Sequence, residues 1–215
     1  MNRYDLVIFD LDGTLLDTSA GILAALKRIL PEFSLPIPAD EKLRSYIGPP
    51  VEYTLQAHYA LKEEECRKVS ARFREVYFGD QLFNANPFPE IEELLKACKQ
   101  RGVKLAVATN KREYYTLKLL DALGLKDYFE KIRGTDEMGR LKKTDLIRAC
   151  VLETGVAPER SLMVGDAWSD EEGAEEAGVD FAAAMYGFGF AHVPPKKYVF
   201  LAESPLSLLS CIEGE

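Results

Sequence analysis

Two carboxylates separated by one residue follow the first mostly apolar stretch of the chain. Asp10 and Asp12 come directly after residues 4–9, whose composition is typical of a buried strand. In an open α/β sheet, ligands bind beyond the carboxyl ends of the strands, so acids at that position indicate chemistry. Two crowded carboxylates repel each other unless a cation or a shared proton offsets the repulsion. The sequence therefore predicts a metal ion bound near these two residues.

Polar residues also follow two later apolar segments, residues 103–109 and 160–165. These residues are Thr109, Asn110, Asp166 and Asp170. Parallel strands present their carboxyl ends at one edge of a sheet, so side chains about a hundred positions apart can meet there. We expect these residues to form one active-site crevice with the first two acids.

The residue types at this edge suit phosphoryl transfer through a covalent intermediate. A carboxylate can attack phosphorus to form an acyl-phosphate, and Asp10 is the candidate nucleophile. Asp12 would protonate the leaving alcohol oxygen and later take a proton from the attacking water. Mg²⁺ prefers oxygen ligands, which Asp10, Asp166 and the backbone carbonyl of Asp12 would supply. The Thr109 hydroxyl, the Asn110 backbone amide and a lysine ammonium would stabilise charge on the phosphate oxygens.

Two kinds of hydrophobic pattern divide the chain. Residues 19–82 show helical periodicity and no convincing strand, whereas helices and strands alternate from Pro89 onward. Helices are predicted at residues 90–101, 114–123, 144–154, 170–177 and 205–212, and strands at 103–109, 160–165, 179–185 and 198–200. The first four of these helices end at glycines, as expected for left-handed caps. Such alternation predicts a parallel sheet.

We therefore expect a doubly wound, Rossmann-like α/β core with an all-helical domain inserted after the first strand. Residues 1–17 and 84–215 would form the catalytic core, and residues 18–83 would form a helical cap. A chain of 215 residues with 47% hydrophobic content is long enough to bury a core and carry such an insertion.

Composition limits the classes of partner and cofactor. The net charge of −8 argues against nucleic acid as a general partner and favours a small ligand. The four cysteines are scattered without a Cys-x-x-Cys pair, which indicates reduced thiols and no zinc site. Neither a signal peptide nor a membrane-spanning segment is expected. These observations predict a cytoplasmic monomer or homodimer that acts on a small molecule.

Three motifs make the chain resemble the haloacid dehalogenase superfamily of phosphohydrolases over most of its length. Residues 10–14 match Asp-x-Asp-Gly-Thr, Thr109 ends the strand of the second motif, and residues 165–170 match Gly-Asp-x-x-x-Asp. The helical insertion resembles the family's C1-type cap. Residues 46–50 and 186–189 resemble segments of phosphoglycolate-phosphatase-like members. The resemblance implies substrate contacts from Gly13, Asn110, Gly48 and Pro49.

The family's lysine motif leaves two candidate residues. Residues 134–143 are one position shorter than the subgroup pattern, so the alignment of the lysine is ambiguous. We expect Lys143 to be the active-site lysine, and Lys142 is the alternative if the chain aligns with members that carry Lys-Pro at this point. Asp170 would orient this lysine or a water bound to the metal. Residues 86–89 depart from the Pro-Gly turn common in relatives, which affects the geometry of the cap hinge. Dehalogenation is disfavoured because true dehalogenases lack an acid at the position of Asp12.

The resemblance implies a magnesium-dependent phosphatase that acts on small phosphorylated metabolites through an aspartyl-phosphate. Phosphoglycolate-like and nucleotide-like phosphomonoesters are the candidate substrates, and pyrophosphate is another. One alternative is a phosphomutase resembling β-phosphoglucomutase, which would keep the phosphoryl group for re-transfer. Another is a non-catalytic binding module on the same fold, against which the full set of acids, threonine and lysine weighs.

Several residues also have a structural interpretation. Thr109 and Asn110 could cap a helix, Trp168 could pack in the core or border the crevice, and residues 48–50 could be a plain helix stop. Asp17 is expected to cap the helix that begins near Ser19. The remaining polar residues of interest are expected on solvent-facing or structural positions: Glu171, Glu172, Glu175, Glu176, His58 and His192.

Overall fold

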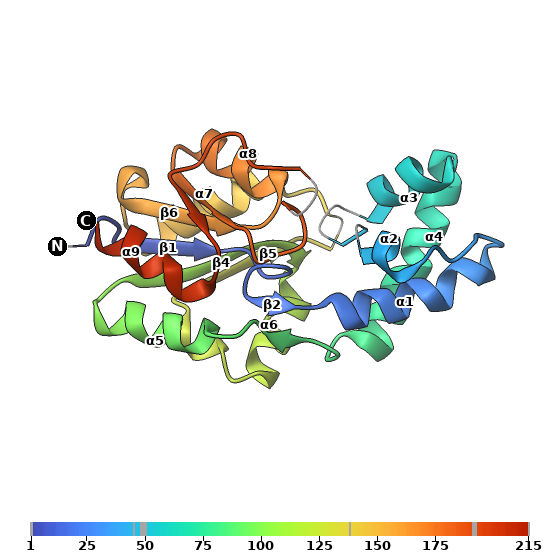
Figure 1. The fold of residues 1–215 in the computed structure, drawn as a ribbon, viewed down its shortest axis with the longest axis horizontal. Coiled ribbons are helices and arrows are strands. Elements are labelled where there is room, and N and C mark those ends of the chain that lie inside the picture. Colours follow the sequence, from blue (N-terminus) through green and yellow to red (C-terminus); the bar gives the residue numbers. More distant parts are fainter. Residues whose placement is uncertain (1, 45, 48–50, 138, 191–192, 215) are drawn as a thin grey trace. The chain divides into compact units, whose positions relative to one another are not determined.

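The chain divides into two compact units, which are described separately. The computed structural model describes all residues except 1, 45, 48–50, 138, 191–192 and 215. Residues 1–17 and 86–215 form one unit, and residues 18–85 form the other. Figure 1 shows the ribbon of both.

A six-stranded sheet in the order β5-β4-β1-β6-β7-β8 forms the centre of the larger unit. Every neighbouring pair of these strands is parallel. The strands are β1 (Leu6–Phe9), β4 (Lys104–Arg112), β5 (Lys131–Thr135), β6 (Ser161–Gly165), β7 (Asp180–Ala184) and β8 (Phe200–Ala202). The predicted doubly wound parallel sheet is confirmed.

Helices cover both faces of this sheet. Figure 1 shows α7 and α8 on one face and α5 and α6 on the other. The helices are α5 (Ile91–Gln100), α6 (Glu113–Ala122), α7 (Lys143–Thr154), α8 (Trp168–Ala177) and α9 (Leu208–Glu213). Short 3₁₀ turns lie at Lys126–Tyr128, Pro158–Arg160 and Pro205–Ser207. Two-sided covering explains why the strands read as continuous apolar runs.

Strand β1 lies in the middle of the core. All four of its residues are fully buried, and Ile8 lies opposite Ala106 on β4 and Met163 on β6. Ile147 of α7 belongs to the same hydrophobic cluster as Ile8. This packing anchors the strand whose carboxyl end carries the first two acids.

The predicted glycine caps of α7 and α8 are confirmed. Gly155 and Gly178 adopt φ values of 69° and 76°, and each is the left-handed residue that ends its helix. Glycine adopts this conformation without the steric penalty that a Cβ atom would bring.

Two predictions about strands were wrong. Strand β5 was not predicted, because it lies at a sheet edge and its residues 131–133 are half-exposed and include Lys131 and Arg133. The last strand was predicted at residues 198–200 but runs from Phe200 to Ala202. Pairing with Ala182–Ala184 of β7 determines where β8 begins and ends. The short apolar pattern at residues 198–200 does not show this pairing.

The smaller unit is helical. It contains α1 (Ser19–Glu32), α2 (Asp40–Arg44), α3 (Val51–Tyr59), α4 (Glu63–Val76) and a π-helical turn at Tyr77–Gln81. Among the described residues of this unit no strand occurs, as predicted. The predicted cap at Asp17 was wrong, because Thr18 is the N-cap residue of α1 and Asp17 belongs to strand β2. His58 is exposed and stacks on Tyr46 with ring centroids 4.2 Å apart, whereas His192 lies outside the described residues.

A two-stranded ribbon marks where the chain leaves the larger unit and returns to it. Strands β2 (Leu16–Asp17) and β3 (Asn86–Pro87) pair antiparallel, with Leu16 opposite Pro87 and Asp17 opposite Asn86. The segment that leads out of the larger unit and the segment that leads back into it therefore lie side by side.

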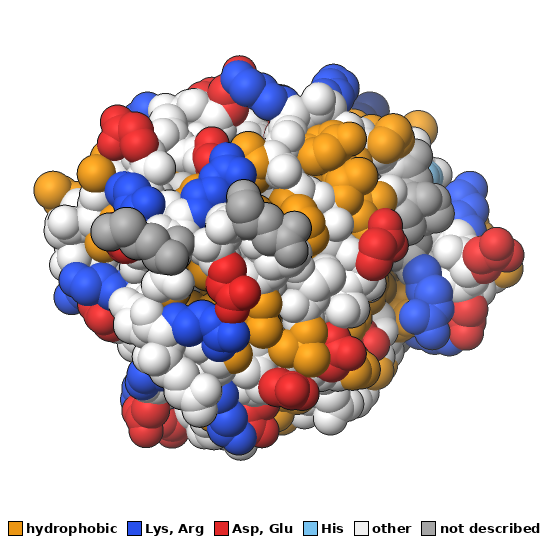
Figure 2. All heavy atoms as spheres, turned by 60° about the vertical axis from the view of Figure 1, so that its left-hand side comes forward, with side chains coloured by type: hydrophobic (Ala, Val, Ile, Leu, Met, Phe, Trp, Pro, Cys, Tyr) orange, Lys and Arg blue, Asp and Glu red, His pale blue; other side chains and the backbone are white. Residues whose placement is uncertain are grey.

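The surface and the helix lengths agree with the composition. Figure 2 shows acidic and basic side chains interspersed over the face that it presents. Within the described part of the chain, every helix is too short or too polar to span a bilayer.

Replacing Ile8 with alanine tests the importance of the packing around β1. The side chain is fully buried, so Ile8→Ala should lower the free energy of unfolding by about 2–5 kcal/mol through lost burial and a residual cavity. The matched control is Leu152→Ala on α7, whose side chain is 82% exposed and whose loss should change stability by less than about 0.5 kcal/mol. Urea unfolding of both variants measures the difference, and equal losses would contradict the assignment of Ile8 to the core.

Candidate active site

Asp10 continues the line of β1 at the edge of the sheet. Its backbone N–H donates to Val164 O at 2.9 Å, and its side chain is buried. The chain then turns sharply at Gly13, which adopts φ 90°. A Cβ atom on Gly13 would lie 2.2 Å from Asp166 Oδ2. Glycine is therefore required here both by the backbone conformation and by the close approach of Asp166.

Lys143, the first residue of α7, is the lysine that reaches Asp10. Its Nζ lies 2.5 Å from Asp10 Oδ1, 2.8 Å from Asp170 Oδ1 and 2.9 Å from Ala108 O. The ammonium donates hydrogen bonds to Asp10 Oδ1 and Ala108 O, and it forms an ion pair with Asp170. Lys142 is exposed and precedes the helix, where its backbone N–H donates to Asp145 Oδ2 at 3.0 Å. The geometry thus favours Lys143 over Lys142.

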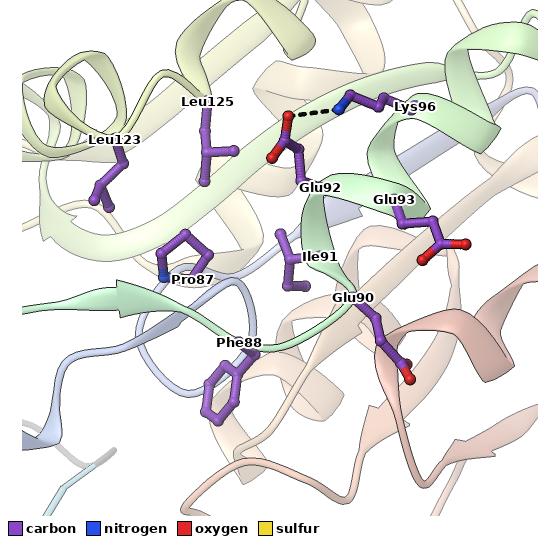
Figure 3. A pocket seen from close by; sticks show the side chains of 9 residues that line it. All are labelled: Pro87, Phe88, Glu90, Ile91, Glu92, Glu93, Lys96, Leu123 and Leu125. Carbon is purple, nitrogen blue, oxygen red and sulfur yellow. Dashed lines mark ion pairs between the residues drawn. The ribbon is translucent and has the colours of Figure 1, made fainter.

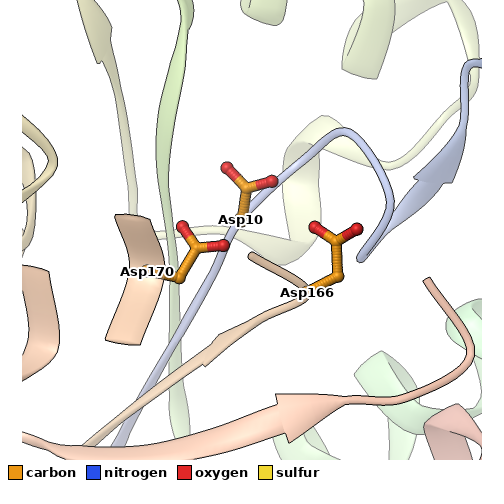
Figure 4. Close-up of side chains that lie close together, drawn as sticks. All are labelled: Asp10, Asp166 and Asp170. Atoms are coloured by element: carbon orange, nitrogen blue, oxygen red, sulfur yellow. The ribbon is translucent and has the colours of Figure 1, made fainter. Parts of the chain in front are cut away.

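Asp10 and Asp170, which contact this lysine, lie close to a third buried acid, Asp166. Asp10, Asp166 and Asp170 each offer a carboxylate oxygen, and these oxygens lie within 4.8 Å of one another. Figure 4 shows the three side chains close together, although each comes from a different segment of the chain. The convergence of Asp10 with acids more than 150 positions away follows from the parallel pairing of β1 with β6.

Burial and mutual repulsion perturb these acids strongly. Burial raises the pKa of Asp10 to about 7, with Lys143 opposing the shift and Asp170 adding to it. Burial, Asp170 and Asp10 raise the pKa of Asp166 to about 8. Burial disfavours the charged form of Lys143, but Asp10 and Asp170 outweigh this effect and raise its pKa overall. The cluster carries more negative charge than one ammonium neutralises, which suits a divalent cation with oxygen ligands.

Asp12 lies beside a second buried lysine. Lys111 Nζ is 2.9 Å from Asp12 Oδ1 and 2.8 Å from Asp12 Oδ2. The Lys111 side chain is 5% exposed, whereas that of Asp12 is 22% exposed. Lys111 was not among the predicted site residues, although its position two residues after Thr109, near the end of a central strand, was a usable signal. This residue joins the set of candidate site residues.

Thr109 and Asn110 do not cap a helix. Strand β4 continues to Arg112, which is the N-cap residue of α6, so the helix-cap interpretation was wrong. Thr109 is buried, and its Oγ1 accepts a hydrogen bond from Lys111 N at 3.2 Å. Asn110 is exposed. Their predicted contacts with phosphate stay a prediction.

The remaining predicted residues have different outcomes. Gly48 and Pro49 lie outside the described residues. Trp168 begins α8 and is 45% exposed, which excludes a fully buried packing role. Glu171 was predicted to face solvent, but it is buried and its Oε1 accepts hydrogen bonds from Lys196 N and Lys197 N at 2.9 and 2.5 Å. This prediction failed because the returning chain covers that turn of α8, whereas Glu172, Glu175 and Glu176 are exposed as expected.

A separate pocket lies elsewhere in the larger unit. It has a volume of about 490 Å³ and is lined by residues of β3, α5 and the end of α6, among them Phe88, Ile91 and Leu125. Figure 3 shows the pair of Glu92 and Lys96 at this pocket, with 2.6 Å between Oε1 and Nζ. Its lining residues do not include the clustered acids.

Removing either adjacent lysine should have very different effects on stability. In metal-free protein at pH 8, Lys143→Met leaves buried carboxylates without their ammonium and should lower the free energy of unfolding by about 3–5 kcal/mol. Lys142→Met is the matched control and should change it by less than about 0.5 kcal/mol, because Lys142 is exposed. Urea unfolding in EDTA checks both values, and a larger loss for Lys142→Met would reverse the assignment.

The raised pKa of Asp166 predicts a pH dependence of stability. Its folded pKa of about 8 lies above 3.8, the ordinary value for an aspartate side chain, so the folded protein binds more protons than the unfolded chain between these values. Stability of the metal-free protein should therefore fall as pH rises from about 4 to 8, by up to about 1.4 kcal/mol per pH unit for this group. Asp166→Asn removes this contribution and should make the decline less steep, while the contribution of Asp10, whose pKa is also raised, remains.

Unfolding experiments at pH 5, 7 and 9 in EDTA measure this effect. Glu172→Gln, at an exposed position of the same helix region, is the control and should retain the parent profile. An unchanged slope in Asp166→Asn would show that Asp166 does not carry the excess protons.

Comparison with known proteins places this site in a family. The sequence model described as haloacid dehalogenase-like hydrolase matches residues 7–184. The chain is 37% identical to a phosphoglycolate phosphatase of Aquifex aeolicus, over 85% of each chain. It is 34% identical to the tyrosine-protein kinase PtkA of Mycobacterium tuberculosis, over 86% of this chain and 64% of that protein.

A solved structure supports the same relationship. A haloacid dehalogenase-like family hydrolase from Streptococcus pneumoniae superimposes with a TM-score of 0.89 at 28% identity, covering 97% of this chain and 98% of the other. The chain belongs to the haloacid dehalogenase-like hydrolase family.

Proposed function

We propose that this chain is a magnesium-dependent phosphatase that hydrolyses small phosphomonoesters through an aspartyl-phosphate on Asp10. The observation that carries this proposal is the buried group of Asp10, Asp166 and Asp170 beyond the ends of β1 and β6, in which Lys143 pairs with Asp10 and Asp170. The phosphoglycolate phosphatase relative supports phosphoester hydrolysis.

The acids provide a suitable site for Mg²⁺. Asp10 and Asp166 would hold the ion together with the backbone carbonyl of Asp12, while Asp170 would keep Lys143 in place. Burial without full charge compensation raises the pKa values of Asp10 and Asp166, which is the environment that a divalent cation relieves. When bound, the ion would neutralise phosphate charge and orient the phosphoryl group.

The chain's own residues would carry the covalent steps. The Asp10 carboxylate would attack phosphorus while Asp12 gives a proton to the leaving alcohol oxygen. Asp12 would then take a proton from the water that attacks the aspartyl-phosphate, releasing inorganic phosphate. Lys143 and the Thr109 hydroxyl would stabilise the charge on the phosphoryl oxygens, with Asn110 and Gly13 contributing to substrate binding.

Lys111 bears on the class of substrate. Its ammonium is buried beside Asp12, the residue proposed to protonate the leaving group of the substrate. A second anionic group on the substrate, such as the carboxylate of phosphoglycolate, would compete with Asp12 for this ammonium. Phosphoesters with a second acidic group are therefore the preferred candidates, with nucleotide-like esters next.

We also propose roles for the two units and for the setting of the enzyme. Residues 1–17 and 86–215 would be the catalytic core, and residues 18–85 would be a cap that contributes Gly48 and Pro49 to substrate recognition. The enzyme would be a cytoplasmic monomer or homodimer.

Transfer to an acceptor other than water is a second candidate. One of the two relatives described above is named a phosphatase and the other a tyrosine-protein kinase, so the names include a phosphoryl-transfer reaction as well as a hydrolysis. A phosphomutase would use Asp10 and Asp12 in the same way but return the phosphoryl group to a sugar phosphate. Product analysis separates these reactions, because hydrolysis releases free phosphate whereas transfer yields a new phosphoester.

Substitution of the first two acids tests the mechanism. Asp10→Asn should reduce phosphate release from phosphoglycolate by at least about 10³-fold, because the covalent route is lost. Asp12→Asn should reduce it by about 10²–10⁴-fold, most strongly for substrates with poor leaving groups. The assay measures phosphate with and without Mg²⁺, and acid quenching followed by mass spectrometry detects the aspartyl-phosphate.

The controls and contradictory outcomes are distinct for each residue. Glu172→Gln, at an exposed position, should keep the parent rate. Parent-like turnover in Asp10→Asn would remove Asp10 as the nucleophile. No turnover by the parent protein across a broad phosphoester panel with Mg²⁺ would instead favour a non-catalytic binding module.

A further inference from the structure

Two backbone amides hold one oxygen of the Asp166 carboxylate. Phe188 N and Gly189 N donate to Asp166 Oδ2 at 2.7 and 3.0 Å. A carboxylate oxygen has two lone pairs in its plane, so these two donors fill the hydrogen-bonding capacity of Oδ2. The other oxygen, Oδ1, is left for a cation at the acidic cluster. The amides thus select which oxygen of Asp166 serves as a ligand.

The chain around Asp166 leaves no space for extra atoms. A Cβ on Gly187 would lie 2.3 Å from Gly13 O and 2.4 Å from Asp166 Cβ. A Cβ on Gly189 would lie 2.5 Å from Asp166 O. Two glycines therefore let residues 186–189 approach closely enough for their amides to reach the carboxylate.

Two aromatic side chains anchor these residues to the rest of the larger unit. The Tyr186 hydroxyl donates to Thr14 O at 3.1 Å, which ties the segment to the turn after Asp10. The Phe88 ring lies 5.3 Å from the Tyr186 ring and 5.9 Å from the Phe188 ring. Phe88 N also donates to Leu15 O at 3.1 Å. Phe88 therefore connects residues 186–189, which its ring contacts, with the turn after Asp10, which its backbone N–H contacts.

We propose that residues 186–189, termed here the carboxylate-holding loop, position Asp166 for metal binding, with Phe88 and Tyr186 as positioning residues. The loop fixes the orientation of the carboxylate in the metal-free protein. Binding of a cation therefore does not include the entropy cost of ordering this ligand. This inference rests on the proposed function, because it assigns Asp166 as a ligand of Mg²⁺. It adds residues that are not themselves metal ligands to the determinants of metal affinity.

Metal affinity measured in solution tests the loop directly. Calorimetric titration with Mg²⁺ and electron paramagnetic resonance with Mn²⁺ give dissociation constants without any substrate. Gly187→Ala should raise the dissociation constant by about 10–100-fold, because its Cβ would push the loop away from Asp166. Tyr186→Phe and Phe88→Leu should raise it by smaller factors, since each loosens an anchor and leaves the amides in place.

Each variant has a matched control. Gly79→Ala places a Cβ where it meets nothing within 4 Å, and Phe83→Leu changes a ring that is 61% exposed. Both should bind Mn²⁺ as the parent protein does. Should Gly187→Ala fail to fold by circular dichroism, the two milder variants Tyr186→Phe and Phe88→Leu decide the question.

Nuclear magnetic resonance of the metal-free protein provides a second readout. Replacing Asp166 with alanine should shift the amide protons of Phe188 and Gly189 upfield and speed their exchange with solvent, because a charged acceptor is lost. Unchanged amide signals would overturn the inference whatever the metal affinities show.

The outcomes distinguish the inference from the proposed function. If the parent protein binds Mg²⁺ and the variants Gly187→Ala, Tyr186→Phe and Phe88→Leu all bind it equally well, the loop does not position Asp166, while the proposed function stands. If the parent protein neither binds Mg²⁺ nor responds to it, the proposed function fails and the inference fails with it. Weaker Mg²⁺ binding in these three variants, together with parent-like binding in Gly79→Ala and Phe83→Leu, supports both the inference and the proposed function.

Discussion

A single buried ammonium holds the site together. Lys143 Nζ joins Asp10, Asp170 and the carbonyl of Ala108, so one cation links the end of β1 with β4 and the start of α8. Burying these carboxylates without such a partner would cost free energy, because a buried charge is tolerated only when it is paired. The close spacing of the buried acids is the feature on which the proposed Mg²⁺ site depends.

The sheet determines where this charge can be placed. Parallel pairing of β1 with β4 and β6 brings the ends of three strands to one edge, and a fully buried β1 keeps the acids that follow it away from bulk water. Close packing of Gly13 and Gly187 against Asp166 then limits the orientations of that carboxylate. Strand pairing and burial therefore determine where the carboxylates of Asp10 and Asp166 lie, and the packing of the glycines restricts the orientation of Asp166.

Much of the sheet and of the acidic cluster could be predicted from the sequence, because both leave local patterns. Alternating apolar segments with glycine caps revealed the parallel sheet, and polar residues after the strands revealed Asp10 and Asp166. The missed features depend on contacts between distant segments: Lys111 is recognisable as a site residue once Asp12 lies beside it, and Glu171 is buried by the chain at residues 196–197. Edge strand β5 carries charged residues and lacks the apolar pattern of the central strands.

The paired strands β2 and β3 have a consequence for the architecture. Because Asp17 and Asn86 are partners in an antiparallel ribbon, the inserted segment begins and ends about 5 Å apart, the usual spacing of paired residues. A segment whose ends lie at that spacing fits the same junction, so a change in the length or sequence of residues 18–85 need not disturb the pairing of the sheet strands.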